Sequence, residues 1–190
     1  MKKLLLLTCV LILSFGGTLF AQEAQLPVPA QETQDGVFKI YKEMPWSLGA
    51  NFEFNQNTRK NSASGYGISI DRYVGTPLIA MGLRGNMHTD NQTVTATEVL
   101  FNVRAYIPIV NSASINTSAF AQLGLGGSFY SEEGRERDTY TMDVLAGCRI
   151  FFNRGFALGF LRGFYVEPYI RTGFPVLFSM GLAAGHWFNF

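Results

Sequence analysis

Cysteine and histidine are scarce in this sequence, and their scarcity limits the chemistry that it can carry. The 190 residues include two cysteines, Cys9 and Cys148, and two histidines, His88 and His186. The histidines lie far apart, with no cysteine or carboxylate near them at the spacing of a metal motif. A single cysteine follows the N-terminal apolar segment, so no intrachain disulfide is expected in the mature chain. We therefore expect no metal, no cofactor and no disulfide.

Charged residues are also few, and the two signs nearly balance. Asp, Glu, Lys and Arg make up 15% of the chain, as 15 basic and 14 acidic residues. This balance gives no reason to expect binding to nucleic acid. Only three lysines, Lys39, Lys42 and Lys60, follow the first 21 residues. The outer face of a soluble β-sandwich usually carries many more lysine and glutamate residues.

Long apolar runs are absent after the N-terminus. Residues 1–21 combine two early lysines, an apolar stretch and a small-residue segment that ends at Ala21, which predicts a cleaved signal peptide. Lipidation at Cys9 is not favoured, because the apolar stretch before it is too short. No later run is long enough for a membrane helix. Residues 22–45 are polar and proline-containing, and we predict a leader there.

The rest of the chain alternates apolar and polar residues. In the first segment Leu48, Phe52 and Phe54 share one face, while Glu53 and Asn55 share the other. This period of two predicts β-strands. It recurs in eight segments, at 46–56, 65–73, 78–88, 94–107, 114–130, 139–152, 164–172 and 177–190.

The distribution of residues between the two faces predicts the kind of sheet. The apolar face carries large and aromatic side chains, whereas the polar face mixes Gly, Ser and Asn with isolated charges. Nine charged residues fall on the polar face: Glu53, Asp71, Arg84, Glu98, Arg104, Asp143, Arg149, Glu167 and Arg171. Arg72 is the exception, at a strand end. A lipid-facing apolar surface around a polar lumen is typical of a membrane barrel. We predict an all-β fold over 46–190, an eight-stranded antiparallel up-and-down transmembrane β-barrel, with a bulge at Pro168.

The last nine residues, 182–190, resemble the closing strand of a known family. They alternate in character and end on Phe190, with Phe188 two residues before; His186 departs from the usual apolar pattern. With the signal peptide and the eight segments, this ending resembles the small outer-membrane β-barrels of bacteria, the OmpA-like, OmpX-like and OmpW-like proteins. The resemblance covers about 46–190.

The resemblance implies a location and a set of partners. The mature protein would lie in the outer membrane of a diderm bacterium, surrounded by lipid, with residues 22–45 in the periplasm. Phe190 and Phe188 would be the signal for the outer-membrane assembly machinery. A host or environmental ligand would meet the outward loops at 57–64, 89–93 and 131–138; residues 173–176 form the fourth outward turn. Aromatic residues near strand ends are interpreted as a girdle at the membrane interfaces: Trp46, Tyr73, Tyr106, Tyr140 and Trp187.

Three functions remain open at this stage. The first is a non-enzymatic structural or surface-interaction protein, whose lumen is plugged by its polar side chains, because eight strands enclose little more than their own side chains. The alternative is an OmpW-like porin or transporter for a small solute, with hydrophobic solutes included among the candidates. The third is a lipid-modifying enzyme using His88 near Asp90. No nucleophile motif accompanies that pair, so we assign no catalytic residue, and we interpret His88 as a polar residue of the barrel rim.

Overall fold

The chain forms one closed sheet of eight strands. The computed structural model describes residues 44–57, 62–76, 78–90, 95–111, 115–132, 135–152 and 163–189. The strands are β1 (Trp46–Asn57), β2 (Ser62–Tyr73), β3 (Ile79–Asp90), β4 (Thr95–Asn111), β5 (Ile115–Glu132), β6 (Arg135–Phe152), β7 (Phe164–Phe174) and β8 (Val176–Phe188). No helix within these ranges has the length and apolarity needed to cross a membrane.

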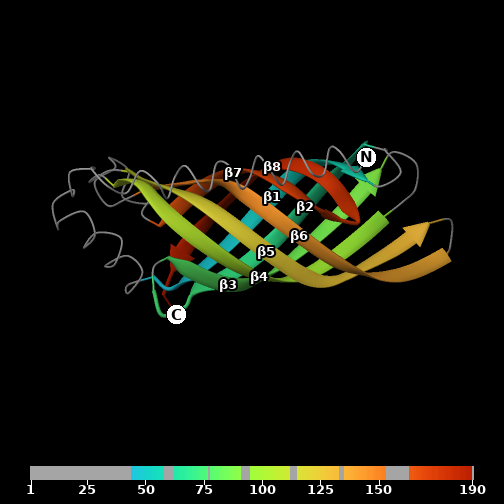
Figure 1. Cartoon of the computed structure of the whole chain (residues 1–190), viewed down its shortest axis with the longest axis horizontal. Coiled ribbons are helices and arrows are strands. Elements are labelled where there is room, and N and C mark those ends of the chain that lie inside the picture. Colours follow the sequence, from blue (N-terminus) through green and yellow to red (C-terminus); the bar gives the residue numbers. More distant parts are fainter. Residues whose placement is uncertain are drawn as a thin grey trace, which may run out of the picture. The chain divides into compact units, whose positions relative to one another are not determined.

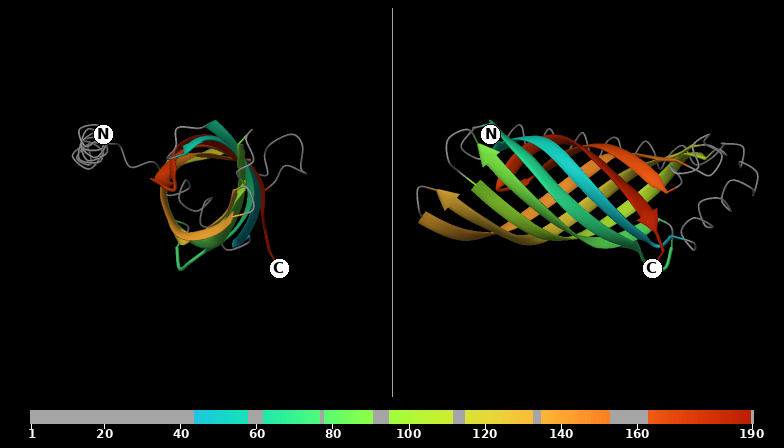
Figure 2. Two further views of the ribbon diagram at one scale, coloured as in Figure 1. Left: turned by 90° about the vertical axis from the view of Figure 1, so that its right-hand side faces the viewer. Right: turned by 180° about the vertical axis from the view of Figure 1, so that it is seen from behind.

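Each strand pairs antiparallel with the next strand along the chain, and β8 closes the sheet against β1 (Figures 1 and 2). The eight-stranded antiparallel up-and-down barrel predicted from the alternation is therefore confirmed. A tight turn follows β2, where Gly75 has a φ of 70° and the Val74 N–H donates to the Ile79 carbonyl oxygen at 2.9 Å.

The hairpin of β5 and β6 is longer than the sequence predicted. Strand pairing continues to Glu132↔Arg135, so most of the predicted loop 131–138 is strand. The loops predicted at 57–64, 89–93 and 173–176 are likewise shortened by longer strands. The sequence-based strand bounds were too short because the alternation of apolar and polar residues fades near the strand ends, where most residues are polar, although backbone pairing continues there. Residues 135–141 extend past β7, because the pairing of β6 with β7 begins at Met142↔Phe174. The hairpin projects beyond its neighbours (Figure 1).

Pro168 does not produce the predicted bulge. Pairing of β6 with β7 lapses after Gly147↔Tyr169 and resumes at Ile150↔Val166 in the same register, so neither strand carries an extra residue. On its other side Pro168 keeps its place opposite Leu182 of β8. Proline lacks an N–H group, which accounts for a lapse in the ladder without requiring an insertion.

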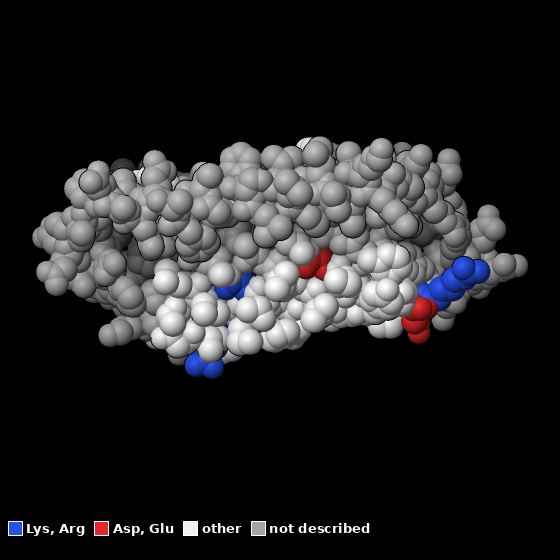
Figure 3. All heavy atoms as spheres, in the orientation of Figure 1, with Lys and Arg blue, Asp and Glu red and all other residues white. Residues whose placement is uncertain are grey.

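The two faces of the barrel wall differ sharply in chemistry. Large apolar side chains point outward and are exposed in the isolated chain, with Ile68 at 65%, Leu125 at 64% and Leu123 at 62%. The described surface in Figure 3 is mostly uncharged, with few charged side chains. Polar and charged side chains instead point into the barrel.

Aromatic side chains fill the end of the barrel at which β1 begins and β8 ends. Trp187 is 0% exposed, and its ring stacks on that of Tyr73 at 4.2 Å; Tyr106 is 5% exposed. The girdle interpretation is therefore wrong for these three residues, because they occupy positions whose side chains point into the barrel. Tyr140 is 67% exposed, and Trp46 lies under the guanidinium of the outward Arg72, 5.1 Å from its ring centroid. These two have the outward placement that a girdle requires.

Candidate functional site in the barrel interior

The barrel interior collects the charged residues of the polar face. Each of the nine is at most 5% exposed, and each strand except β5 and β8 contributes at least one. The residues are Glu53, Asp71, Arg84, Glu98, Arg104, Asp143, Arg149, Glu167 and Arg171. A buried charge is costly unless it is paired, so their contacts determine what this interior can do.

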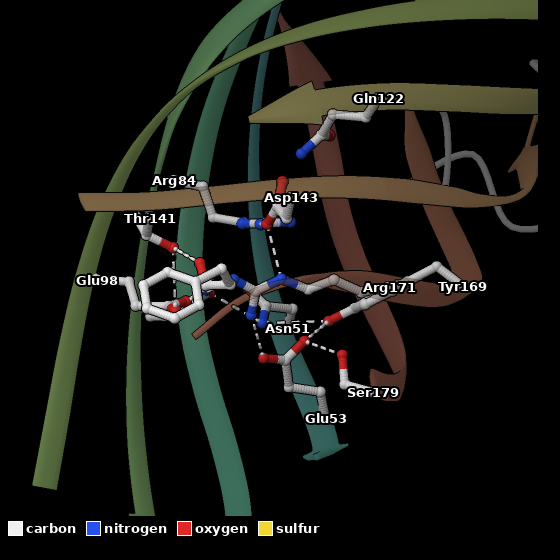
Figure 4. A network of polar contacts seen from close by, with 12 residues as sticks. Asn51, Glu53, Arg84, Glu98, Gln122, Thr141, Asp143, Tyr169, Arg171 and Ser179 are labelled. Atoms are coloured by element: carbon white, nitrogen blue, oxygen red, sulfur yellow. Dashed lines mark hydrogen bonds and ion pairs between the residues drawn. The ribbon is translucent and has the colours of Figure 1, made fainter. Parts of the chain in front are cut away.

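Arg171 is the hub of the first group of contacts (Figure 4). Its three guanidinium nitrogens donate to three different carboxylates: Nη1 to Glu53 at 2.9 Å, Nη2 to Glu98 at 2.6 Å and Nε to Asp143 at 2.6 Å. Arg84 also donates to Asp143. We call Glu53, Arg84, His88, Glu98, Asp143 and Arg171 the Arg171 cluster. It ties together strands β1, β3, β4, β6 and β7 across the lumen.

Neutral side chains complete the hydrogen bonds of this cluster. The Tyr169 and Ser179 hydroxyl groups donate to Glu53 Oε2 at 3.1 Å and 3.2 Å. The Thr141 hydroxyl lies 3.4 Å from Glu98 Oε1 and 2.9 Å from the Phe174 carbonyl oxygen, and it can donate to either. Tyr169 lies across the inner wall of β8 because Gly181 has no side chain; a Cβ there would be 2.5 Å from the Tyr169 ring and hydroxyl.

His88 belongs to the interior and not to the rim. It is 5% exposed, and its Nε2 lies 2.9 Å from Glu98 Oε2, while its Nδ1 lies 2.7 Å from the Asn55 amide nitrogen and 3.5 Å from Glu53 Oε1. The sequence-based placement of His88 at the rim is wrong, because β3 continues for two residues beyond it. His88 is separated from Asn86 and Arg84 by two and four residues, so all three lie on the same face of β3. This spacing was the sequence signal for an inward position.

A second group of contacts surrounds Arg104, nearer the aromatic end. Arg104 Nη1 lies 3.1 Å from both carboxylate oxygens of Glu167, and its Nε donates to Gln122 at 2.7 Å. Arg149 also donates to Glu167. Asp71 is more loosely held, with its Oδ2 3.9 Å from Arg104 Nη1. We call Asp71, Arg104, Arg149 and Glu167 the Arg104 cluster.

Aromatic rings enclose the Arg149 guanidinium. Its central carbon lies 4.2 Å from the ring centroid of Tyr165, 4.6 Å from that of Tyr106 and 4.9 Å from that of Trp187. A cation over ring faces is stabilised by the ring quadrupole, most of all where water is excluded. This enclosure was not predicted from the sequence. Two of its three rings could have been, because Tyr165 lies on the same strand face as Glu167, and Tyr106 on the same strand face as Arg104.

Several sequence-based interpretations fall outside the described residues. These are the signal peptide 1–21, nearly all of the leader 22–45 and the assembly signal at Phe190. Phe188 ends β8 and is half-buried. Among the described residues, no group of three or more His, Cys, Asp or Glu side chains is arranged to hold a metal ion.

Neither a protein-family model nor a curated protein sequence matches this chain. Two solved structures share its fold. The N-terminal β-barrel domain of Pseudomonas aeruginosa OprF aligns with 77% of this chain and 98% of its own length, at 12% identity and a TM-score of 0.55. Neisserial surface protein A (NspA) aligns with 76% of this chain and 96% of its own length, at 12% identity and a TM-score of 0.51. The chain therefore has the eight-stranded barrel fold of these two proteins.

Proposed function

We propose that the protein is an integral β-barrel of the bacterial outer membrane with a structural or surface-interaction role. The apolar outer face supports this location. A soluble monomer rarely exposes contiguous apolar patches larger than a few hundred Å², whereas here large apolar side chains such as Leu48, Ile68 and Leu125 project from strand after strand. Surrounding lipid would remove the free-energy cost of exposing these apolar side chains to water. The fold shared with OprF and NspA agrees with a membrane location.

The interior supports a plugged lumen in place of a pore. Arg171 joins carboxylates from three strands, and the rings of Tyr73, Tyr106 and Trp187 fill the end where the chain enters and leaves the barrel. An eight-stranded barrel has an interior just wide enough for side chains to fill. The ion pairs then hold the wall together from within.

The surface-interaction role rests on the β5–β6 hairpin. Within the described residues, 135–141 of β6 have β5 on one side and no strand on the other, which leaves a row of backbone N–H and C=O groups without a ladder partner. An unpaired strand edge is a template for an extended segment of another chain. Tyr140, at 67% exposed, and Phe129, at 50%, add apolar area beside it. With the C-terminus in the periplasm, this hairpin faces outward.

We expect cysteine labelling of intact cells to report this orientation. In a Cys148→Ser background, Asp138→Cys on the projecting hairpin is expected to react with a membrane-impermeant maleimide on whole cells. Thr76→Cys, in the exposed turn at the opposite end, is expected to react only after the outer membrane is permeabilised. Equal labelling of both positions on intact cells, or labelling of Thr76→Cys alone, would contradict the proposed placement.

The transporter alternative makes a different prediction about conductance. If side chains plug the lumen, the purified protein in a planar lipid bilayer is expected to give no discrete, reproducible channels. Channels that Arg171→Met enlarges would instead show that the Arg171 cluster lines a conducting path, and would favour a porin-like function. The lipid-modifying alternative gains no support from His88, which contacts Glu98 and Asn55 inside the barrel, away from the outer face.

A further inference from the structure

In the Arg171 cluster the carboxylates outnumber the arginines. It contains three carboxylates, Glu53, Glu98 and Asp143, and two arginines, Arg84 and Arg171. The Arg104 cluster is balanced, with two residues of each sign. His88 lies between two of these carboxylates, with its Nε2 2.9 Å from Glu98 Oε2 and its Nδ1 3.5 Å from Glu53 Oε1, and Asp143 is the carboxylate of the cluster that it does not contact. Among the described residues of the cluster, the carboxylates thus outnumber the guanidinium groups by three to two.

The two oxygens of Asp143 have different surroundings. Oδ2 accepts from both Arg84 and Arg171. Oδ1 is buried and accepts no hydrogen bond from any described residue. It lies over Gly124, the register partner of Asp143 on β5, where an added methyl group would overlap it. One oxygen of Asp143 is therefore held by two arginines, while the other is left without a hydrogen-bond donor among the described residues.

Asn102 brings a second oxygen to the same place. It is the register partner of Gly124 on β4, its side chain is 1% exposed, and neither its Oδ1 nor its Nδ2 has a hydrogen-bond partner among the described residues. Its Oδ1 lies 3.0 Å from the position that a Cβ would take on Gly124. Two buried acceptor oxygens, one from a carboxylate and one from an amide, thus lie within 3.0 Å of one point over Gly124, and the Leu100 Cδ2 methyl group lies 3.0 Å from the same point. Buried polar groups of this kind are rarely left without a partner.

We propose that Asp143 Oδ1 and Asn102 Oδ1 bind one small monovalent cation, Na⁺ or K⁺, over Gly124. Carboxylate and amide oxygens are the ligands that hard cations prefer, and water molecules would complete the coordination. A single positive charge balances the three carboxylates of the Arg171 cluster against its two arginines, whereas a divalent ion would add one positive charge too many. The site goes beyond the proposed function and does not depend on the surrounding membrane or on a surface partner.

The test compares cations at constant ionic strength. The full chain is folded in a zwitterionic detergent in NaCl, KCl or the chloride of N-methyl-D-glucamine, a cation too large for the site. Since a ligand that binds only the folded state raises its stability, the unfolding temperature is expected to be at least about 4 °C higher in one of the small cations. Gly124→Ala is expected to abolish this difference, because its methyl group fills the site without changing any charge.

Gly127→Ala is the matched control on the same strand. A Cβ at Gly127 would meet only the Phe129 ring, at 3.7 Å and 3.8 Å, so this variant is expected to keep the cation dependence of the wild type. A measurement on the wild type covers the case in which Gly124→Ala does not fold. The side-chain amide resonance of Asn102, assigned by its loss in Asn102→Leu, is expected to shift saturably as Na⁺ or K⁺ replaces N-methyl-D-glucamine.

Three results would overturn the proposal. One is equal stability in all three salts together with an unmoved Asn102 resonance. Another is a cation dependence that Gly124→Ala keeps in full. The third is a cation dependence that appears only in His88→Gln, because a proton on His88 would then supply the charge in the wild type.

Discussion

Replacing Arg171 by methionine is expected to lower the free energy of unfolding by about 3–5 kcal/mol, the usual cost of removing one partner from a buried ion pair. The substitution keeps much of the side-chain volume and removes three hydrogen bonds, those to Glu53, Glu98 and Asp143. Only Arg84, and His88 if it took up a proton, would then remain to balance three carboxylates. Urea unfolding of the folded protein in detergent, followed by the heat-modifiable gel mobility typical of barrels, measures the change.

Two further substitutions show whether the effect of Arg171→Met comes from the loss of one positive charge or from the loss of the buried contacts of Arg171. Arg137→Met removes the same charge from an exposed position on the β5–β6 hairpin, and surface changes of this kind usually alter stability by no more than about 0.5 kcal/mol. Arg171→Lys keeps the charge but lacks a planar guanidinium whose nitrogens can donate to three carboxylates. Its loss of stability is therefore expected to lie between those of Arg171→Met and Arg137→Met. If Arg171→Met were as stable as Arg137→Met, the Arg171 cluster would not hold the wall together.

The face of the barrel wall on which each charged residue lies could be predicted from the sequence. Side chains alternate between the two faces along a strand, so the face depends only on neighbouring residues. Glu98 and Arg104 are six residues apart on one strand, so one assignment of faces places both inside, and both are buried. The same argument would have placed Tyr106 inside. It was instead assigned to the girdle because of its residue type and its position near a strand end. Alternation along the strand was therefore a more reliable guide to the direction of the side chain than residue type, even for an aromatic residue.

The partners of each charge could not be predicted in this way. Arg171 donates to Glu53 across 118 residues of sequence. That contact depends on how the registers of successive hairpins add around the barrel, and no local pattern encodes their sum. Likewise, the space over Gly124 is apparent only once β4 and β6 are known to flank β5 in register. The length of the β5–β6 hairpin also escaped prediction, because polar residues near its tip interrupt the alternation.

An arginine at position 68 is expected to destabilise the barrel by about 2–4 kcal/mol if the outer face lies in lipid, since that is the cost of a charge at the middle of a membrane barrel. Ile68 points outward, is 65% exposed in the isolated chain and pairs with Ala50 and Gly85 at mid-strand. The variants are folded into lipid vesicles, and their urea unfolding gives the free energies.

The choice of controls makes this measurement specific for lipid. Ile68→Ala removes the apolar contacts without adding a charge, so the difference between Ile68→Arg and Ile68→Ala isolates the cost of placing a charge at that depth. Ser131→Arg adds the same charge on the projecting hairpin, where Ser131 is exposed, and is expected to change stability by no more than about 0.5 kcal/mol. In water the Ile68 side chain would already be exposed, and an arginine there would cost as little as at Ser131. Equal stabilities of Ile68→Arg and Ser131→Arg would therefore place the outer face in water and exclude a membrane-embedded barrel.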